Sequence, residues 1–305
     1  MTQYLGIRDP GAAGGSWIMY LCNHHPARMR ILGEAHREPQ LDFAGDGEPW
    51  PGITVERYDE KVIAFMDSQA AQGIACTGIV KCFWAKGAAH IRARGGRILS
   101  LVRNPLLVVG VNRRKDKAPE LYLGHAPRND DEQFLAINLY YKESYQAIWR
   151  MREKEPITRI EDYNRSCGTD GRFLKEVMEW ATQTDWPDEY IKYVREHCLP
   201  GYAYPIKTRR ENGVVVGIDS VLSVREPWRM NWYDDPRAER IWKSWPAYER
   251  DVFADTMGEV AQLFGYNYLT QPGFVEPDWA LRDAYAWSGA DLRPIPYEGD
   301  VMGLR

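Results

Sequence analysis

A glycine-rich segment near the start of the chain constrains its fold most. An apolar run at residues 4–7, typical of a buried strand, leads into three glycines, and an apolar, helix-like stretch follows from Ser16 to Cys22. Glycine permits backbone angles that other residues rarely adopt, and the first amides of a helix attract phosphate. The segment has neither the Gly-Lys-Ser/Thr ending of a P-loop nor a Gly-x-Gly-x-x-Gly fingerprint. It therefore predicts an anion-binding strand–loop–helix unit or, alternatively, a tight turn without a ligand.

Two later segments place chemically useful side chains at the ends of predicted strands. The apolar run 29–32 ends in Gly33 and Glu34, and the run 98–102 ends in Arg103. Ligands of open α/β sheets gather beyond the carboxyl ends of the strands, and the arginine fork suits phosphate. Glu34 is thus a candidate base and Arg103 a candidate phosphate ligand. A solvated or helix-capping acid and an arginine paired with a carboxylate are the structural alternatives.

Strand and helix signals alternate in the first part of the chain. Strands are expected at 3–8, 29–33, 74–83 and 97–103, and helices at 15–25, 56–72 and 86–95. Later helices are expected at 129–153, 171–183, 187–197 and 246–264, with a hairpin turn or strand at 211–216. The pattern predicts an α/β fold with a central, mostly parallel sheet flanked by helices and a helix-rich second half.

We expect a single domain over residues 1–305. Residues 1–125 would form a nucleotide-binding core, 126–269 a helical part on the acceptor side, and 270–305 a C-terminal extension. Many aromatic residues fall late in the sequence, and they suit either an acceptor pocket or helix packing in a core.

Composition excludes several classes of partner. A net charge of −4 argues against a nucleic-acid binder, and no apolar run is long enough to span a membrane. The N-terminus lacks the basic and apolar regions of a signal peptide. Five cysteines without metal-ligand spacing indicate free thiols in a reducing compartment and no metal site. These features predict a cytoplasmic protein, and they leave open whether it forms a homodimer.

As an ordered set, the segments resemble the PAPS-dependent sulfotransferases of the bacterial and tyrosylprotein types (PAPS is 3′-phosphoadenosine 5′-phosphosulfate). Residues 13–17 (Ala-Gly-Gly-Ser-Trp) are similar to the 5′-phosphosulfate loop, and 25–26 with 32–34 to the His-Pro and Gly-Glu motifs. Residues 101–105 (Leu-Val-Arg-Asn-Pro) are similar to the 3′-phosphate strand. Weaker similarities at 160–163, 240–242 and 263–266 extend the resemblance to about Tyr268, and it implies the P-loop-like sulfotransferase fold.

The resemblance implies transfer of a sulfuryl group from PAPS to a hydroxyl or amine of a small-molecule acceptor, with release of PAP (3′-phosphoadenosine 5′-phosphate). Arg103 would hold the 3′ phosphate, and Glu34 would accept the acceptor's proton. His36 is an alternative base, because the ordinary pKa of histidine is near neutrality. The residues implied at the 5′ end of the nucleotide are Ala13, Gly14, Gly15, Ser16 and Trp17.

Two positions depart from the family's pattern. Ala12 stands where the loop usually carries a lysine or arginine, and Val111 where a serine is usual. Asn112 offers a substitute donor for the serine, and Arg8, Lys81 and Lys86 are candidates for the missing cation. The departures also suit a second hypothesis, in which the chain is a non-catalytic nucleotide- or anion-binding protein on the same fold. A kinase-like transferase is disfavoured because the loop lacks a lysine.

Overall fold

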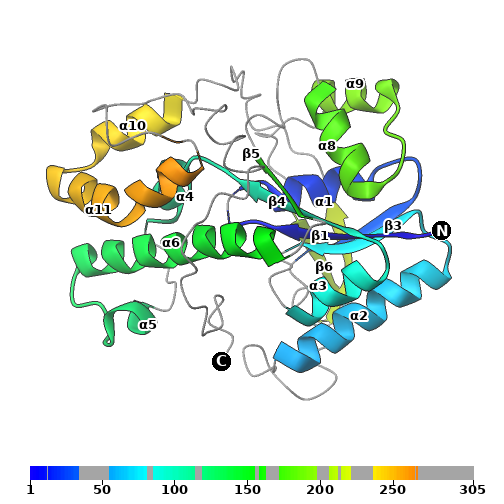
Figure 1. Ribbon diagram of the computed structural model, residues 1–305, viewed down its shortest axis with the longest axis horizontal. Coiled ribbons are helices and arrows are strands. Elements are labelled where there is room, and N and C mark those ends of the chain that lie inside the picture. The colour runs from blue at the N-terminus through cyan, green and yellow to red at the C-terminus, as the bar shows by residue number, and fades with distance from the viewer. Residues whose placement is uncertain are drawn as a thin grey trace. The chain divides into compact units, whose positions relative to one another are not determined.

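Five strands form one sheet in the order β2-β3-β1-β4-β5, and two more form a separate pair (Figure 1). This computed structural model describes residues 1–11, 13–33, 55–80, 85–113, 119–154, 158–162, 172–197, 206–211, 214–220, 236–264 and 266. The strands are β1 (Gln3–Arg8), β2 (Met29–Leu32), β3 (Cys76–Val80), β4 (Arg97–Val102), β5 (Thr158–Asp162), β6 (Ile206–Glu211) and β7 (Val214–Ser220).

Helices follow most of the strands along the chain. They are α1 (Gly15–Asn23), α2 (Val55–Ala71), α3 (Ala85–Ala93), α4 (Pro105–Asn112), α5 (Pro119–Leu123), α6 (Asp130–Lys154), α8 (Arg172–Thr182), α9 (Asp188–His197), α10 (Pro236–Ser244) and α11 (Ala247–Leu263). This is the α/β architecture predicted from the sequence, with a central, mostly parallel sheet flanked by helices.

The strands in the middle of the sheet run parallel, because a crossover helix connects one strand to the next and brings the chain back to the edge of the sheet where the first strand began. β3 pairs in parallel with β1 on one side and with β2 on the other, so that Gly78 lies opposite both Leu5 and Ile31. All residues of β3 are buried, which is why its sequence is a continuous apolar run without alternation. The register brings the carboxyl ends of these three strands to one edge of the sheet.

The chain divides into two compact units. The first comprises Met1–Arg8, Gly14–Leu99 and Asn164–Trp232, and the second comprises Asp9–Ala13, Ser100–Tyr163 and Tyr233–Arg305. These two units are defined by contacts in space and not by position along the chain. They therefore do not test the division into residues 1–125, 126–269 and 270–305, which stays a prediction. Within the first unit, α2 and α3 lie on one face of the sheet, and α1 and α8 lie on the other (Figure 1).

A polar cluster in the first unit joins β1 to α2 and α3. The hydroxyl of Tyr4 donates to Asp67 Oδ1 at 2.8 Å, and His90 Nε2 lies 3.0 Å from the same oxygen. Arg94 donates to Asp67 Oδ2 at 3.2 Å. Burial, followed by the hydrogen bond and charge of Asp67, raises the pKa of Tyr4 to about 12.

This raised pKa predicts a loss of stability in alkaline solution. Unfolded tyrosine releases its proton near its ordinary pKa of about 10, whereas folded Tyr4 keeps it to about 12, so the free energy of unfolding falls across this window. Between pH 9 and pH 11 we expect the free energy of unfolding of the wild type to fall by roughly 1 kcal/mol more than that of Tyr4→Phe. Urea unfolding of both proteins at the two pH values measures this difference, and equal losses would contradict it.

The second unit is built around α6, which packs against α4, α5 and α11. Tyr145 and Trp149 of α6 make edge-to-face contacts with Phe264, while Phe134 contacts Trp245 in the same way. The late aromatic residues Trp245, Phe253, Phe264 and Tyr266 are all buried. At these positions the core interpretation of the aromatic residues is correct.

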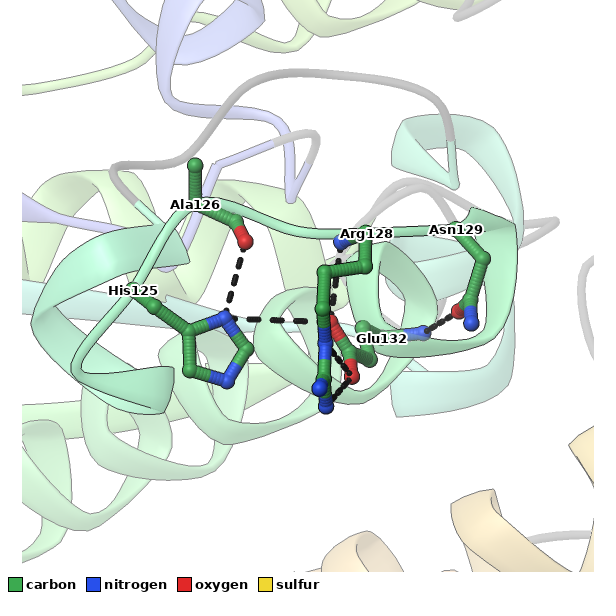
Figure 2. A network of polar contacts seen from close by, with 5 residues as sticks. All are labelled: His125, Ala126, Arg128, Asn129 and Glu132. Atoms are coloured by element: carbon green, nitrogen blue, oxygen red, sulfur yellow. Dashed lines mark hydrogen bonds and ion pairs between the residues drawn. The ribbon is translucent and has the colours of Figure 1, made fainter.

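The start of α6 is fixed by side chains (Figure 2). Asn129 Oδ1 accepts a hydrogen bond from the Glu132 amide at 2.9 Å, which is the cap expected from the sequence. Glu132 in turn accepts from the backbone amide of Arg128 at 2.9 Å and from its Nε at 2.8 Å. These hydrogen bonds lower the pKa of Glu132 to about 2, although burial opposes the shift. The cap holds in place the helix that reaches the candidate site.

Several elements differ from the expectations. The strand expected over 74–83 is described only over Cys76–Val80, while α4, α5, β5 and α10 were not predicted. The hairpin alternative at 211–216 is confirmed, since β6 and β7 pair in antiparallel fashion. Two of the five cysteines, Cys22 and Cys76, are described, and both are buried free thiols. Among the helices that the structure describes, none is long and apolar enough to cross a membrane.

Candidate functional site

The loop after β1 is tightly turned. Asp9 Oδ1 accepts a hydrogen bond from the Gly11 amide at 2.7 Å. Gly11 and Gly14 have φ angles of +94° and +95°, which explains why glycine is used at both positions. Asp9 and Ala13 are buried, and Ala12 lies outside the described residues. The glycines therefore shape the loop, as the sequence predicts.

Helix α1 begins directly after this loop. Gly14 is its N-cap and provides no side-chain hydrogen bond, and no acidic residue lies in the first turn. The carbonyl of Gly14 accepts from the amides of Trp17 and Ile18. Gly15 and Trp17 are buried, whereas the Ser16 side chain is not described. The first amides of a helix have no acceptor within it, so this end favours an anion.

Arg103 directly follows β4, and its side chain is largely buried. The next residue, Asn104, caps α4, because its Oδ1 accepts from the Leu106 amide at 2.9 Å, and Pro105 occupies the first turn. The Asn-Pro pair is thus a helix start signal, which was available in the sequence. It fixes the direction of the chain immediately after Arg103.

Two tyrosines of α6, four residues apart, contact these segments within the second unit. The hydroxyl of Tyr145 donates to the carbonyl oxygen of Arg103. The hydroxyl of Tyr141 lies 3.8 Å from the position that a Cβ on Gly11 would occupy. Both side chains are buried. Residues at i and i+4 share one helix face, so the same face of α6 lies beside the loop after β1 and bonds the end of β4.

This role of α6 was not predicted from the sequence. The sequence predicts a helix over 129–153 and gives no partner for the hydroxyl of either tyrosine. The only signal is the spacing of Tyr141 and Tyr145. That spacing predicts a shared face but does not identify what the face contacts.

Asn112, the predicted substitute for the missing serine, is buried at the end of α4. Its Nδ2 donates to the carbonyl of Val108 at 2.6 Å, one turn earlier in the same helix. One of its two amide hydrogens is therefore engaged within the helix. Only the second hydrogen and the carbonyl oxygen remain for a ligand.

The predicted catalytic residues are only partly described. Lys86 lies exposed in the first turn of α3, and no described contact joins it to the loop. Glu34, His36 and Lys81 lie outside the described residues. Arg8, the other candidate cation, is fully buried at the last position of β1. The described residues include no group of three or more acidic, histidine or cysteine side chains able to hold a metal ion.

His25 has a structural role. Its ring packs against Trp186 and Tyr190, with centroid distances of 4.7 and 5.0 Å. Its Nδ1 accepts a hydrogen bond from the Ala27 amide at 3.1 Å. Burial lowers the pKa of this histidine, so the neutral form is favoured. The histidine of the His-Pro motif thus shapes the turn between α1 and β2.

The chain is similar to a mouse sulfotransferase, SULT7A1, in a crystal structure complexed with PAP. The TM-score is 0.43 and the sequence identity 12%, over 84% of this chain and 83% of that one. No protein family profile and no curated protein sequence match the chain.

Proposed function

We propose that this chain binds PAPS and transfers its sulfuryl group to a hydroxyl or amine of a small-molecule acceptor, releasing PAP. One observation carries the proposal. Gly11, in the loop that leads into the segment assigned by resemblance to the 5′ phosphosulfate, lies beside Tyr141 of α6, and Arg103, the residue assigned to the 3′ phosphate, is held at its carbonyl by Tyr145 of the same helix. The loop after β1 and the end of β4, which are far apart in the sequence, thus lie beside one face of α6.

The proposed roles follow from the charge of the ligand. PAPS supplies an activated sulfuryl group, and the protein's task is to position it and neutralise its charge. The amides of residues 13–17 would hold the 5′ end, and Arg103 would bind the 3′ phosphate with charge-assisted hydrogen bonds. Glu34 would accept the acceptor's proton, and Lys81, Lys86 or Arg8 would replace the cation missing at Ala12. The proposal is for a cytoplasmic enzyme.

Release of PAP from PAPS in the presence of phenols, alcohols and amines tests the proposal. We expect release to depend on an acceptor, and Glu34→Gln to slow it roughly 100-fold, because general base catalysis contributes at least that factor. His36→Ala is the matched control and should retain the wild-type rate. Loss in His36→Ala alone would transfer the role of base to His36, and no loss in either variant would refute the assignment of a base here.

The departures at Ala12 and Val111 favour one alternative function. A non-catalytic protein on this fold would use the same loop to hold a nucleotide or another anion without reaction. It would bind PAP but release none from PAPS with any acceptor class. The release assay, performed on protein already shown to bind PAP, separates the two functions.

A further inference from the structure

The ring of His25 joins two parts of the first unit that are far apart in the sequence. Trp186, which lies between α8 and α9, and Tyr190 of α9 pack against this ring at centroid distances of 4.7 and 5.0 Å. The hydroxyl of Tyr190 donates to the carbonyl of Leu21 in α1 at 2.7 Å. His25 is 5% exposed, and Trp186 is fully buried. The beginning of α9 is thus held against the end of α1 by contacts that centre on one histidine.

The hydrogen bond of the His25 ring determines which nitrogen carries the proton. Nδ1 accepts from the amide of Ala27 at 3.1 Å, and a backbone N–H can only donate. The neutral ring therefore carries its single proton on Nε2. A protonated ring has a hydrogen on both nitrogens, so the Nδ1 hydrogen would point at the hydrogen of the Ala27 amide. Protonation is thus incompatible with the turn between α1 and β2 in its present form.

The surroundings of the ring also oppose a positive charge. Burial has the largest effect and lowers the pKa of His25, while the charge and backbone of Asp185 raise it by less. Asp185 is the charged group that acts on the ring among the described residues, and Tyr190 is the other titratable side chain packed against it. The exposed neighbour His24 lies instead with its Nδ1 2.9 Å from the carbonyl oxygen of Tyr20. The packing therefore requires the neutral form of His25.

We propose that His25 is an acid-sensitive latch, whose protonation breaks the hydrogen bond from Ala27 and releases the beginning of α9 from the end of α1. The proton comes from solvent and binds Nδ1, and no covalent bond between heavy atoms changes. The pKa of the folded histidine lies below its ordinary value of 6.5, so the latch contributes its full stability above pH 6.5 and loses it as the pH falls below that value. The inference goes beyond the proposed function and is independent of it, because it involves no nucleotide.

Hydrogen exchange of the full chain at about pH 7.5 and about pH 5.5, on either side of the ordinary histidine pKa, measures the release. Protection factors are calculated against the intrinsic exchange rate at each pH, so that only opening of the structure is compared. We expect protection of the α9 amides to fall at the lower pH by up to about tenfold, the limit that an exposed histidine with the ordinary pKa of 6.5 sets over this range. The amides of the buried strand β3 should keep their protection. Equal protection of α9 at both pH values would overturn the proposal.

Carboxylates near the latch are the main competing explanation for an acid response. Glu179 Oε1 accepts from the Trp186 amide at 3.2 Å, and Asp185 acts on the ring, but ordinary carboxyl groups titrate near pH 4. In the wild type, the loss of protection should begin as the pH falls below 6.5. A loss that begins only near pH 4 would assign the release to a carboxylate and would overturn the role of His25 without any variant.

Two substitutions at neighbouring histidines isolate the proton of His25. In His25→Asn the side-chain oxygen can accept from the Ala27 amide in place of Nδ1, but it does not titrate. Protection of α9 in this variant should no longer differ between the two pH values. His24→Asn is the matched control, because it removes an exposed histidine, and it should keep the acid response of the wild type. An acid response that persists in His25→Asn, or that disappears in His24→Asn, would refute the latch.

Discussion

Arg103→Ala is expected to weaken PAP binding by about 2–5 kcal/mol, roughly 30- to several-thousand-fold in the dissociation constant. The side chain is 8% exposed and follows the last residue of β4, while Tyr145 holds its backbone carbonyl. A buried guanidinium matches a phosphate with a fixed pair of donors. Its removal leaves the 3′ phosphate without this partner, and calorimetric titration with PAP measures the loss.

Two further variants make this result specific. Arg103→Lys keeps the charge but loses the fork, so it should fall between the wild type and Arg103→Ala, and it guards against a folding defect in the alanine variant. Arg97→Ala removes an arginine from the first position of the same strand, where it lies 5.7 Å over the ring of Trp180. It should bind PAP normally. If both Arg103 variants bound PAP as tightly as the wild type, the assignment of Arg103 to the 3′ phosphate would be contradicted.

Gly78→Ala is expected to destabilise the fold by at least about 3 kcal/mol, a large part of the total stability of a typical domain. Gly78 lies in β3, paired with Leu5 of β1 and Ile31 of β2. A Cβ at this position would overlap the carbonyl oxygen of Leu5, lie 2.8 Å from its carbonyl carbon and lie 3.2 Å from Ile31 Cδ1. The nearest atoms belong to the backbone of a central strand, so no rotamer change relieves the overlap.

Gly73→Ala is the matched control for this substitution. Gly73 precedes β3 and has φ of +72°, and nothing lies within 4 Å of a Cβ built there. We expect a cost of about 1 kcal/mol, from backbone strain alone. Urea unfolding followed by circular dichroism compares the two variants. A Gly78→Ala protein that is as stable as Gly73→Ala would refute the close approach of the β1 backbone at Leu5 to Gly78.

Local sequence patterns predicted much of the fold because the signals were local. The apolar run before the glycine loop predicts β1 with the observed bounds, and Asn129 caps α6 as expected. Helix α4 was not predicted, although Asn104 and Pro105 form a helix start signal. The two residues had been interpreted only as part of a phosphate motif. β5 is short and charged, so it lacks the alternation or apolar run that identifies a strand.

The candidate site was less predictable for a physical reason. Glycine at residues 11 and 14 reflects a local backbone requirement, and the sequence reveals it. The contacts of Tyr141 with Gly11 and of Tyr145 with Arg103 join residues that are distant in the chain. They depend on how α6 packs, which periodicity alone does not specify. The engagement of the Asn112 amide by Val108 likewise appears only once the helix α4 is known.

Thermal unfolding in the presence of PAP, with AMP and ADP as controls, tests the central claim most directly. A ligand that binds only the folded state stabilises it by about 2.7 kcal/mol at 100 times its dissociation constant. We predict a clear upward shift with PAP and none with AMP or ADP at the same concentration, because only PAP carries the 3′ phosphate that Arg103 is proposed to bind. An unchanged midpoint at millimolar PAP would contradict the nucleotide site.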